Sequence, residues 1–541
     1  MTATLAPTAA EQVTDFRSGN EMAAISAKHI DFHVMGYYPI TPSTEIAENL
    51  DEMRAEGEHS IVMIPADGEH GAAGICYGAS VGGGRVFNAT SSQGLLYSLE
   101  QLPVQSGTRF PMLLDIATRA VSAPLDIRGD HSDISFALNT GWLIFLARDP
   151  QAVYDLNLVA LRVAEHADVQ LPAIVAFDGF FTSHQKRRVS YFADPQVVRD
   201  YLGPVPERVT ALDPRHPVTI GPYMNDPDLI NNKYQLVRAM TAAERVIGEE
   251  LTAYAALSGR RYEPVDRYRM DDADVALFLV NSAAETAKDA ADRLREAGVR
   301  AGVISPNVIR PFPADALRDA LRTVKAVVIG ERADSYGAHG GNLAHELKSA
   351  LKDDPENGTL CASRIYGLGG RDFYAEDADA LFRVALDAAE TGRVEIPFDY
   401  YGVAARVHPP VRKRLPAVEP EERLIHVEQG ADGRLRVETP PPWRLAAREK
   451  VVAPGHSACP GCGVFPALNT FFKGLEGDVV VLYQTGCAMV VSTGYPYTSH
   501  RITYVHNLFQ NGAATLSGLV EMFHERIRRG ELPEGEDITF V

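Results

Sequence analysis

Two cysteines on a tight turn give the most specific chemical signal in this 541-residue sequence. Cys459 and Cys462 flank a Pro-Gly pair, so their thiols converge on one point, as the thiolate ligands of a metal must. Cys487 lies in a Thr-Gly-Cys turn that ends a predicted strand at 479–483. Three thiolates can therefore meet, and a fourth ligand is missing. The spacing alone leaves an iron–sulfur cluster, a zinc site and a redox dithiol equally open.

A glutamate stands at the start of a predicted glycine-rich helix in the stretch 67–84, DGEHGAAGICYGASVGGG. The helix dipole favours a carboxylate at the position of Glu69, and a capping role is the simpler local interpretation. Gly74, Gly78 and Gly82 recur every four residues and leave one face bare for another backbone or a flat ligand. Each internal glycine costs about 0.5–1 kcal/mol relative to alanine, so this pattern needs a packing or functional reason.

The stretch 36–48, GYYPITPSTEIAE, predicts a helix start. Thr41 is expected to cap a helix whose first residue is Pro42, where a missing N–H does no harm. The N–H donors of such a start suit a carboxylate or a phosphate. On this stretch alone, a capped surface helix is the favoured interpretation.

Further candidates follow two other predicted strands. Ser92, Gln93 and Gly94 belong to NATSSQGL at 88–95, a turn that offers N–H and O–H donors at the carboxyl end of a strand. Arg119 follows a strand at 112–116 and can bind a carboxylate with two N–H groups, although an ordinary ion pair is the commoner role. His131 lies between two aspartates at 129–133, GDHSD, for which an ordinary loop is the favoured interpretation.

These candidates must be positioned by an α/β fold. Strand-like runs at 60–64, 85–88, 111–116 and 173–177 alternate with helical patterns, which predicts a mainly parallel, doubly wound sheet. We expect a first domain at 1–190, a linker with a helix at 191–270, and a second α/β domain at 271–394. A proline-rich linker at 395–450 and an incomplete third domain at 451–541 follow, ending in a strand at 537–541.

Composition excludes several classes of protein. The formal charge of −19 argues against nucleic acid or an anionic membrane as a partner. The sequence has neither a secretory signal nor an apolar run near the ~20 residues of a spanning helix, so we expect a soluble, cytoplasmic protein. Five cysteines are too few for a disulfide framework, and Cys76 and Cys361 are interpreted as buried or incidental thiols.

Taken together, the motifs resemble the 2-oxoacid:ferredoxin oxidoreductases, thiamine diphosphate enzymes that include pyruvate:ferredoxin oxidoreductase. The resemblance to the pyrimidine-binding domain rests on YPITPS at 38–43, the helix after Glu69, TSSQGL at 90–95, TRA at 118–120, GDHSD at 129–133 and DGFFTSH at 178–184. IRPFP at 309–313 and YGLGGRD at 366–372 resemble the transketolase C-terminal-like second domain. HSACPGCG at 456–463, TGC at 485–487 and YPYTSHRITYVHNLF at 495–509 resemble the start of the diphosphate-binding domain.

The resemblance implies a set of roles. Glu69 hydrogen-bonds the aminopyrimidine ring of the cofactor and drives ylid formation, and Ser92, Gln93 and Gly94 also bind the cofactor. Thr41 and Arg119 hold the substrate carboxylate. Cys459, Cys462 and Cys487 match three of the four thiolates of a [4Fe-4S] cluster. The implied reaction is oxidative decarboxylation of a 2-oxoacid such as pyruvate, with coenzyme A as acyl acceptor and ferredoxin as electron acceptor.

The sequence also departs from the family. The Mg²⁺ motif, a GDG-type turn, is expected just beyond Val541, and the fourth cluster cysteine later still. We therefore expect either a fragment of a longer fusion or a part completed by another polypeptide, acting as a homo-oligomer or with partner subunits. Two alternatives are a non-oxidative thiamine enzyme and a non-catalytic assembly subunit without the magnesium site.

Overall fold

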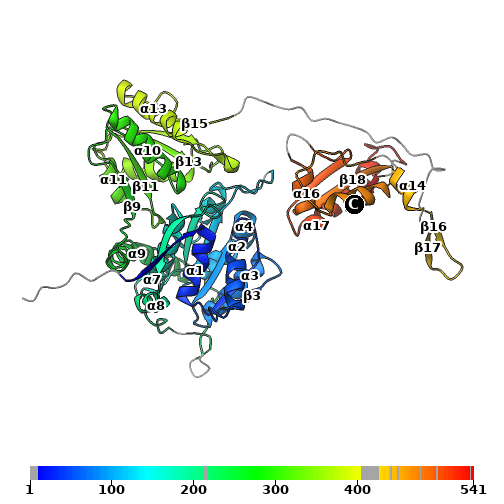
Figure 1. Ribbon diagram of the computed structural model, residues 1–541, viewed down its shortest axis with the longest axis horizontal. Coiled ribbons are helices and arrows are strands. Elements are labelled where there is room, and N and C mark those ends of the chain that lie inside the picture. The colour runs from blue at the N-terminus through cyan, green and yellow to red at the C-terminus, as the bar shows by residue number, and fades with distance from the viewer. Residues whose placement is uncertain are drawn as a thin grey trace, which may run out of the picture. The chain divides into compact units, whose positions relative to one another are not determined.

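A computed structural model describes residues 10–122, 124–208, 210–212, 217–403, 426–438, 441–447, 450–475, 477–494, 498–535 and 538–541. The chain divides into two compact units, Met1–Val403 and Ala404–Val541, each of which is described by itself (Figure 1). Across these described ranges, no helix combines the length and the apolar character needed to cross a membrane. The prolines at 409, 410, 416, 420 and 440 of the predicted linker, and the YPY motif at 495–497, lie outside the described residues.

The first unit contains a seven-stranded sheet. In spatial order the strands are β12 (Val308–Arg310), β6 (Leu143–Ala147), β7 (Ala173–Asp178), β5 (Leu113–Thr118), β4 (Val86–Thr90), β2 (Val34–Tyr37) and β3 (Val62–Pro65). The six strands from β6 to β3 run parallel to one another, and β12 is antiparallel to its neighbour β6. A two-stranded antiparallel ribbon pairs β1 (Gln12–Arg17) with β8 (Arg187–Phe192).

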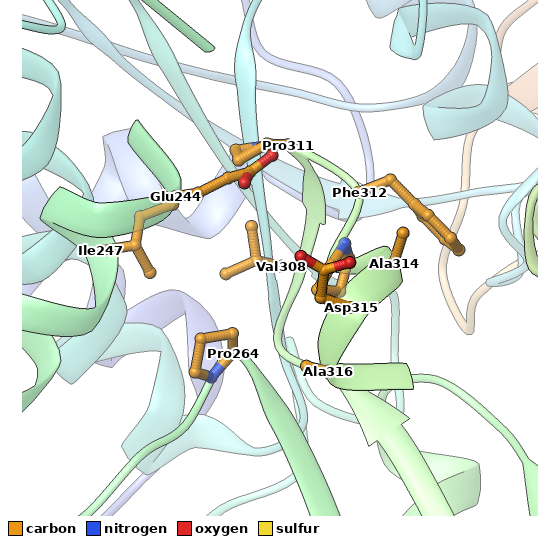
Figure 2. Close-up of a pocket in the computed structure, with 10 residues that line it drawn as sticks. Glu244, Ile247, Pro264, Val308, Pro311, Phe312, Ala314, Asp315 and Ala316 are labelled. Carbon is orange, nitrogen blue, oxygen red and sulfur yellow. The ribbon is translucent and has the colours of Figure 1, made fainter. Parts of the chain in front are cut away.

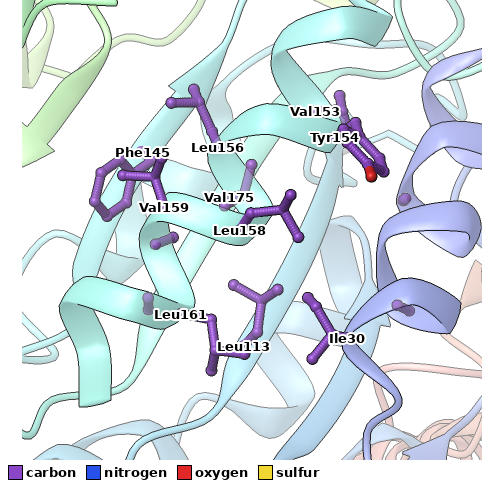
Figure 3. Packing of buried hydrophobic residues seen from close by; sticks show 14 of the residues in the cluster. Ile30, Leu113, Phe145, Val153, Tyr154, Leu156, Leu158, Val159, Leu161 and Val175 are labelled. Carbon is purple, nitrogen blue, oxygen red and sulfur yellow. The ribbon is translucent and has the colours of Figure 1, made fainter. Parts of the chain in front are cut away.

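Alternating side chains of this sheet enter two different cores. Along β5, Leu113 and Ala117 join a core formed with helices α1 (Gly19–Ile30) and α7 (Pro150–Glu165), whereas Leu114 and Ile116 join a core on the other face. Figure 3 shows Leu113 in the first core beside residues of α7. The helices of this block are α1 (Gly19–Ile30), α2 (Thr44–Ala55), α3 (Glu69–Val81), α4 (Ser92–Ser98), α5 (Gln101–Gly107), α6 (Ser132–Ala137), α7 (Pro150–Glu165), α8 (Pro195–Leu202) and α9 (Asp228–Ser258). The sheet is therefore buried on both faces, as a parallel sheet requires.

A second, six-stranded sheet follows in the same unit. Its strands are parallel except for β9, which is antiparallel to β11. In spatial order they are β15 (Phe398–Tyr400), β14 (Leu360–Ile365), β13 (Ala326–Glu331), β10 (Val275–Phe278), β11 (Ala301–Pro306) and β9 (Val265–Tyr268). The accompanying helices are α10 (Ser282–Glu296), α11 (Ala314–Leu321), α12 (Asn342–Lys352) and α13 (Ala375–Thr391), with a short 3₁₀ turn at Leu368–Gly370.

The two sheets share structure rather than standing apart. Strand β12 belongs by sequence to the second block, yet it pairs with β6 and forms the edge of the first sheet. One continuous core also contains Leu114 and Ile116 from the first sheet together with Phe278 and Ile304 from the second. The two blocks are therefore packed into one body.

The second unit holds a small parallel sheet with β18 (Asp478–Gln484) between β19 (Thr503–Asn507) and β20 (Ile538–Phe540). The remaining elements here are a ribbon of β16 (His426–Gln429) and β17 (Leu435–Glu438) and the helices α14 (Pro442–Ala447), α15 (Val464–Lys473), α16 (Cys487–Ser492) and α17 (Gly512–Arg528). The predicted strands at 479–483 and 537–541 correspond to β18 and β20.

The α/β fold class with mainly parallel sheets is confirmed. The predicted strands at 60–64, 85–88, 111–116 and 173–177 match β3, β4, β5 and β7 to within two residues at each end. The predicted bare helix face is confirmed at Gly74 and Gly78, where a Cβ atom would meet no atom of the described chain within 4 Å. It does not extend to Gly82, which follows the last residue of α3 and where a Cβ atom would lie 3.2 Å from the carbonyl oxygen of Ala79. The domain boundaries stay a prediction.

Candidate active site

The residues singled out in the sequence gather at one edge of the first sheet, where four neighbouring parallel strands end. In the spatial order β5, β4, β2 and β3, these strands are followed by Arg119, by residues 92–94, by Thr41 and by Glu69. Open α/β sheets bind their ligands outside the carboxyl ends of their strands. The fold thus places all the candidate residues of the first block where a ligand is expected.

Arg119 links three of these loops. Its guanidinium, on a residue 2% exposed, donates to the carbonyl oxygen of Thr41 at 2.9 Å, to Oε1 of Gln93 at 3.3 Å and to the carbonyl oxygen of Asp126 at 3.3 Å. Burial lowers the pKa of Arg119, and the more distant carboxylates of Asp133, Asp126 and Glu69 partly offset this. A guanidinium nevertheless stays charged in proteins.

This buried positive charge has no close counter-ion. Among the described residues no carboxylate oxygen lies within 4 Å of the Arg119 guanidinium, whose partners are two carbonyls and an amide. Buried charges in proteins are normally paired or bind an ion. Arg119 is therefore suited to an anionic ligand.

Glu69 is the first residue of α3, as predicted, and is 8% exposed. Burial raises the pKa of its carboxyl group, and this effect outweighs a backbone N–H bond and the positive charge of Arg119, which both lower it. A raised pKa shifts the equilibrium of this carboxyl group toward its protonated, proton-donating form. The site therefore holds a buried carboxyl group within electrostatic reach of a buried guanidinium.

The turn at 92–94 packs closely against both groups. A Cβ atom on Gly94 would come within 2.8 Å of Oε1 of Glu69 and 2.4 Å of Oγ1 of Thr90, so this position requires glycine. The Ser92 hydroxyl lies 2.6 Å from both Oε1 of Gln93 and the carbonyl oxygen of Ala120. Ser92 itself has a φ of +47°, a left-handed conformation that costs a non-glycine residue about 1–3 kcal/mol.

Several buried hydroxyls at this edge have no hydrogen-bond partner within the described parts of the chain. They are Oγ1 of Thr90 and Oγ of Ser91 after β4, and Oγ1 of Thr118 at the end of β5. An unpaired buried polar group costs free energy unless a ligand or water satisfies it. Together with Glu69 and the space kept by Gly94, these hydroxyls fit a polar, ring-containing cofactor such as thiamine diphosphate.

The predicted helix start at Thr41 is wrong. Helix α2 begins at Thr44, and Thr41 lies exposed in the preceding turn. The carbonyl oxygen of Pro42 accepts from Nδ2 of Asn20 at 2.8 Å, and the N–H of Ser43 donates to Ile40 at 2.9 Å, so this segment forms a separate turn. Thr41 meets Arg119 through its backbone carbonyl instead.

The buried carboxylate of Asp178 was missed by sequence reasoning, although the DGFFTSH motif after a predicted strand contained the signal. Asp178 ends β7 and lies 2.6 Å from Nε2 of His131, and it accepts the backbone N–H of Ser282 at 3.0 Å. Burial alone would raise the pKa of Asp178, but the ion pairs with His131 and with Arg332, at 3.8 Å, hold it well below its ordinary value. Through Asp178, the loop around His131 is therefore connected to Ser282 and Arg332 of the second block, so it is not an ordinary surface loop.

The second unit contains the three predicted cluster cysteines. The N–H of Cys462 donates to the carbonyl of Cys459 at 3.1 Å, which confirms a tight turn, and Cys487 is the exposed first residue of α16. Thiolates suit an iron–sulfur cluster, yet nowhere in the described residues do three His, Cys, Asp or Glu side chains form a group that could hold a metal. The arrangement of this unit therefore does not by itself fit a cluster.

Cys76 and Cys361 are buried or half-buried thiols, as interpreted from the sequence. Burial raises the pKa of Cys76 to about 12 and that of Cys361 to about 11. Both therefore remain protonated and unreactive near neutral pH.

A separate hollow of about 270 Å³ lies among α9, β12 and the start of α11. It is lined mainly by apolar side chains, with the carboxylates of Glu244 and Asp315 at either side (Figure 2). None of the predicted site residues lines it.

Two models of known protein families match the first unit. The model "Pyruvate flavodoxin/ferredoxin oxidoreductase, thiamine diP-bdg" matches residues 25–251, so the chain carries a thiamine-diphosphate-binding domain. The model "Pyruvate:ferredoxin oxidoreductase core domain II" matches residues 273–378.

Curated relatives match over most of their own length. Pyruvate synthase subunit PorA of Pyrococcus abyssi is 36% identical over 384 residues, which cover 71% of this chain and 96% of the relative. For pyruvate synthase subunit PorA of Thermotoga maritima the identity is 35%, and the alignment covers 68% of this chain and 94% of the relative. For ketoisovalerate oxidoreductase subunit VorA of Pyrococcus abyssi the identity is 34%, and the alignment covers 71% of this chain and 96% of the relative.

A solved structure shares the fold. The 2-oxoglutarate:ferredoxin oxidoreductase of Magnetococcus marinus, solved with 2-oxoglutarate, coenzyme A and succinyl-CoA bound, aligns with a TM-score of 0.54 at 18% identity. The alignment covers 68% of this chain and 64% of that one. At this identity the likeness concerns the fold.

The raised pKa of Glu69 makes a prediction about stability. A group whose pKa is raised on folding stabilises the fold fully below its unfolded pKa, near 4.5, and this stabilisation is lost as pH rises through the folded pKa. Glu69→Gln removes the ionisation, so we expect its melting temperature to rise relative to the parent protein as pH increases from 4 to 8. Differential scanning calorimetry at several pH values measures this.

The control is Glu48→Gln, which makes the same chemical change at an exposed position of α2. Its melting temperature should follow that of the parent protein at every pH. An equal pH trend for both variants would contradict the burial of an ionisable Glu69.

Proposed function

The chain belongs to the 2-oxoacid:ferredoxin oxidoreductase family, and from this premise we propose that it catalyses the oxidative decarboxylation of a 2-oxoacid such as pyruvate. The overall reaction converts the 2-oxoacid and coenzyme A into carbon dioxide, an acyl-coenzyme A and a proton, while two electrons reduce two ferredoxins. The observation that carries this proposal is that the buried carboxyl group of Glu69 and the buried guanidinium of Arg119 both lie at one edge of the first sheet. Within the described residues no carboxylate lies within 4 Å of that guanidinium.

Glu69 is proposed as the acid that holds the pyrimidine ring of thiamine diphosphate. Bound thiamine diphosphate supplies the carbanion that attacks the 2-keto carbon and the electron sink that accepts the electrons left by carbon dioxide. Glu69 is proposed to donate a proton to a ring nitrogen, and its burial favours the protonated form of the carboxyl group that this role needs. Ser92, Gln93 and Gly94 are proposed to line the same pocket, because Gly94 lies directly against the Glu69 side chain.

Arg119 is proposed to bind the carboxylate of the 2-oxoacid. Its guanidinium is held by fixed oxygens of Thr41 and Gln93, so its charge is oriented before the substrate arrives. A preorganised cation in a site of low polarity binds an anion more strongly than a solvated one. Thr41, in the turn after β2, is also proposed to hold the substrate carboxylate.

Further components are proposed from the relatives. The matched relatives are named as subunits, which supports partner subunits for this chain too. We assign no residue to Mg²⁺ or to coenzyme A. Cys459, Cys462 and Cys487 are proposed to supply three thiolates to a [4Fe-4S] cluster. This requires a fourth ligand and requires the three thiols to come together, because in the described residues they do not form a metal-binding group.

Glu69→Gln tests the central role in the assembled enzyme. Because the amide cannot donate a carboxyl proton, we expect kcat for 2-oxoacid-dependent ferredoxin or dye reduction to fall by about 10²–10⁴-fold. Glu48→Gln should retain the parent kcat. Activity of Glu69→Gln within threefold of the parent enzyme would remove Glu69 from the mechanism.

Arg119→Lys tests the binding of the carboxylate. Lysine keeps the charge but cannot bridge Thr41 and Gln93 as the planar guanidinium does, so KM for the 2-oxoacid should rise by about 10–100-fold, with a smaller change in kcat. The control is Arg109→Lys, since Arg109 is a half-buried arginine that also donates to two backbone carbonyls, those of Val169 and Gln170, away from the site. Equal KM values for both variants would contradict the assignment.

Iron and acid-labile sulfide analysis of the anaerobically purified complex tests the cysteine proposal. We expect iron that is lost when Cys459 is changed to serine and retained when Cys361 is changed to serine. Zinc in place of iron, or iron that survives Cys459→Ser, would overturn the cluster assignment.

A further inference from the structure

We propose that Asp133 is a positioning residue that holds the two ligand-binding loops of this site in register, an inference that rests on the proposed function. Asp133 is the second residue of α6, the short helix after the loop that contains His131. One of its carboxylate oxygens, Oδ2, accepts the backbone N–H of Ser92 at 2.8 Å and the backbone N–H of Arg119 at 2.9 Å. A single atom thus joins the loop after β4 to the loop after β5.

Among the described residues, the Asp133 side chain accepts hydrogen bonds from backbone N–H groups alone. Its side chain is fully buried, and its second oxygen, Oδ1, accepts the N–H of Ile134 at 2.7 Å. All three donors are backbone N–H groups, which fix the direction of the chain rather than the identity of a side chain. The carboxylate is therefore part of the scaffold behind the site.

Both loops need this support. Ser92 is held in a left-handed conformation at φ +47°, and its N–H has Asp133 as its partner in the described structure. Arg119 is the first residue of the loop after β5, and its guanidinium donates to Gln93 in the loop after β4. A shift of either loop therefore changes the distance between the guanidinium and Gln93. Without the carboxylate, two N–H groups on buried residues lose their partner, which is costly in the interior of a protein.

Asp133 differs from the other acidic residues nearby. Asp130 accepts hydrogen bonds from Ser132 and Gly369. Asp178 is hydrogen-bonded to His131 and Ser282. Neither accepts the backbone N–H of Ser92 or of Arg119. Only Asp133, among the described acidic side chains, accepts the backbone N–H groups of both Ser92 and Arg119.

The strand β5 offers a matched control. Asp115 is also fully buried, and it accepts a hydrogen bond from Nδ2 of Asn157 at 2.9 Å in the core beneath α7. Changing Asp115 to Asn or Ala removes a buried carboxylate from the same block without touching the loops of the site. Any general loss of stability is therefore reproduced by the control.

The first measurement is hydrogen exchange of the full chain by mass spectrometry, with overlapping peptides that resolve the amides of Ser92 and Arg119. We expect these two amides to exchange at least tenfold faster in Asp133→Ala than in Asp115→Ala, with intermediate rates in Asp133→Asn, whose amide oxygen still accepts both N–H groups. Exchange rates at Ser92 and Arg119 that are equal in Asp133→Ala and Asp115→Ala would overturn the proposal.

The second measurement is steady-state kinetics of the assembled enzyme. Asp133→Ala should raise KM for the 2-oxoacid about tenfold or more. Asp133→Asn should have a KM between those of the parent enzyme and Asp133→Ala, and Asp115→Asn should leave KM unchanged. A KM in Asp133→Ala equal to that of the Asp115 control would reduce Asp133 to a structural residue and overturn the proposal. A parent enzyme that turns over no 2-oxoacid overturns the proposed function instead, and the exchange rates then still decide whether Asp133 holds the two loops.

Discussion

The rest of the site depends on a buried guanidinium that has no carboxylate within 4 Å in the part of the chain that the structure describes. Arg119 is taken out of water and given two carbonyl oxygens and an amide oxygen in place of a carboxylate. These dipoles hold the cation in place but do not carry a compensating negative charge. Glu69 lies within electrostatic reach of Arg119, but its own burial favours the neutral acid. The fold therefore places a buried guanidinium within electrostatic reach of a buried carboxyl group whose pKa is raised.

The parallel sheet makes this combination possible. Because the carboxyl ends of β5, β4, β2 and β3 are neighbours, loops that are far apart in sequence meet at one edge. The hydrogen bonds that join them run mostly through backbone atoms, as for the carbonyl of Thr41 and the N–H groups of Ser92 and Arg119. Such contacts depend on the path of the chain more than on side-chain rotamers, which suits a site that must be rigid before its ligand binds.

Much of this arrangement could be predicted from the sequence, because the patterns that reveal it lie within short stretches of the chain. Glu69, Gly94 and Arg119 each follow a strand that its own apolar pattern reveals, and the sheet rule then places them at one edge. The start of α2 was misplaced because Asn20, distant in sequence, binds the carbonyl of Pro42. The role of β12 and the ion pair between Asp178 and Arg332 also depend on residues far apart in sequence, and no local pattern announces them.

The junction between the two blocks has a consequence for how this chain can be divided. Removing residues after 270 would take away β12, and with it the strand that covers the open edge of β6. The same cut would strip Asp178 of Ser282 and Arg332 and leave its carboxylate buried with His131 alone. An uncovered strand edge invites pairing with other chains, and a half-compensated buried charge weakens the fold that remains. The thiamine-binding block, although it has its own sheet and its own sequence signature, is therefore a poor candidate for excision as a free-standing fragment.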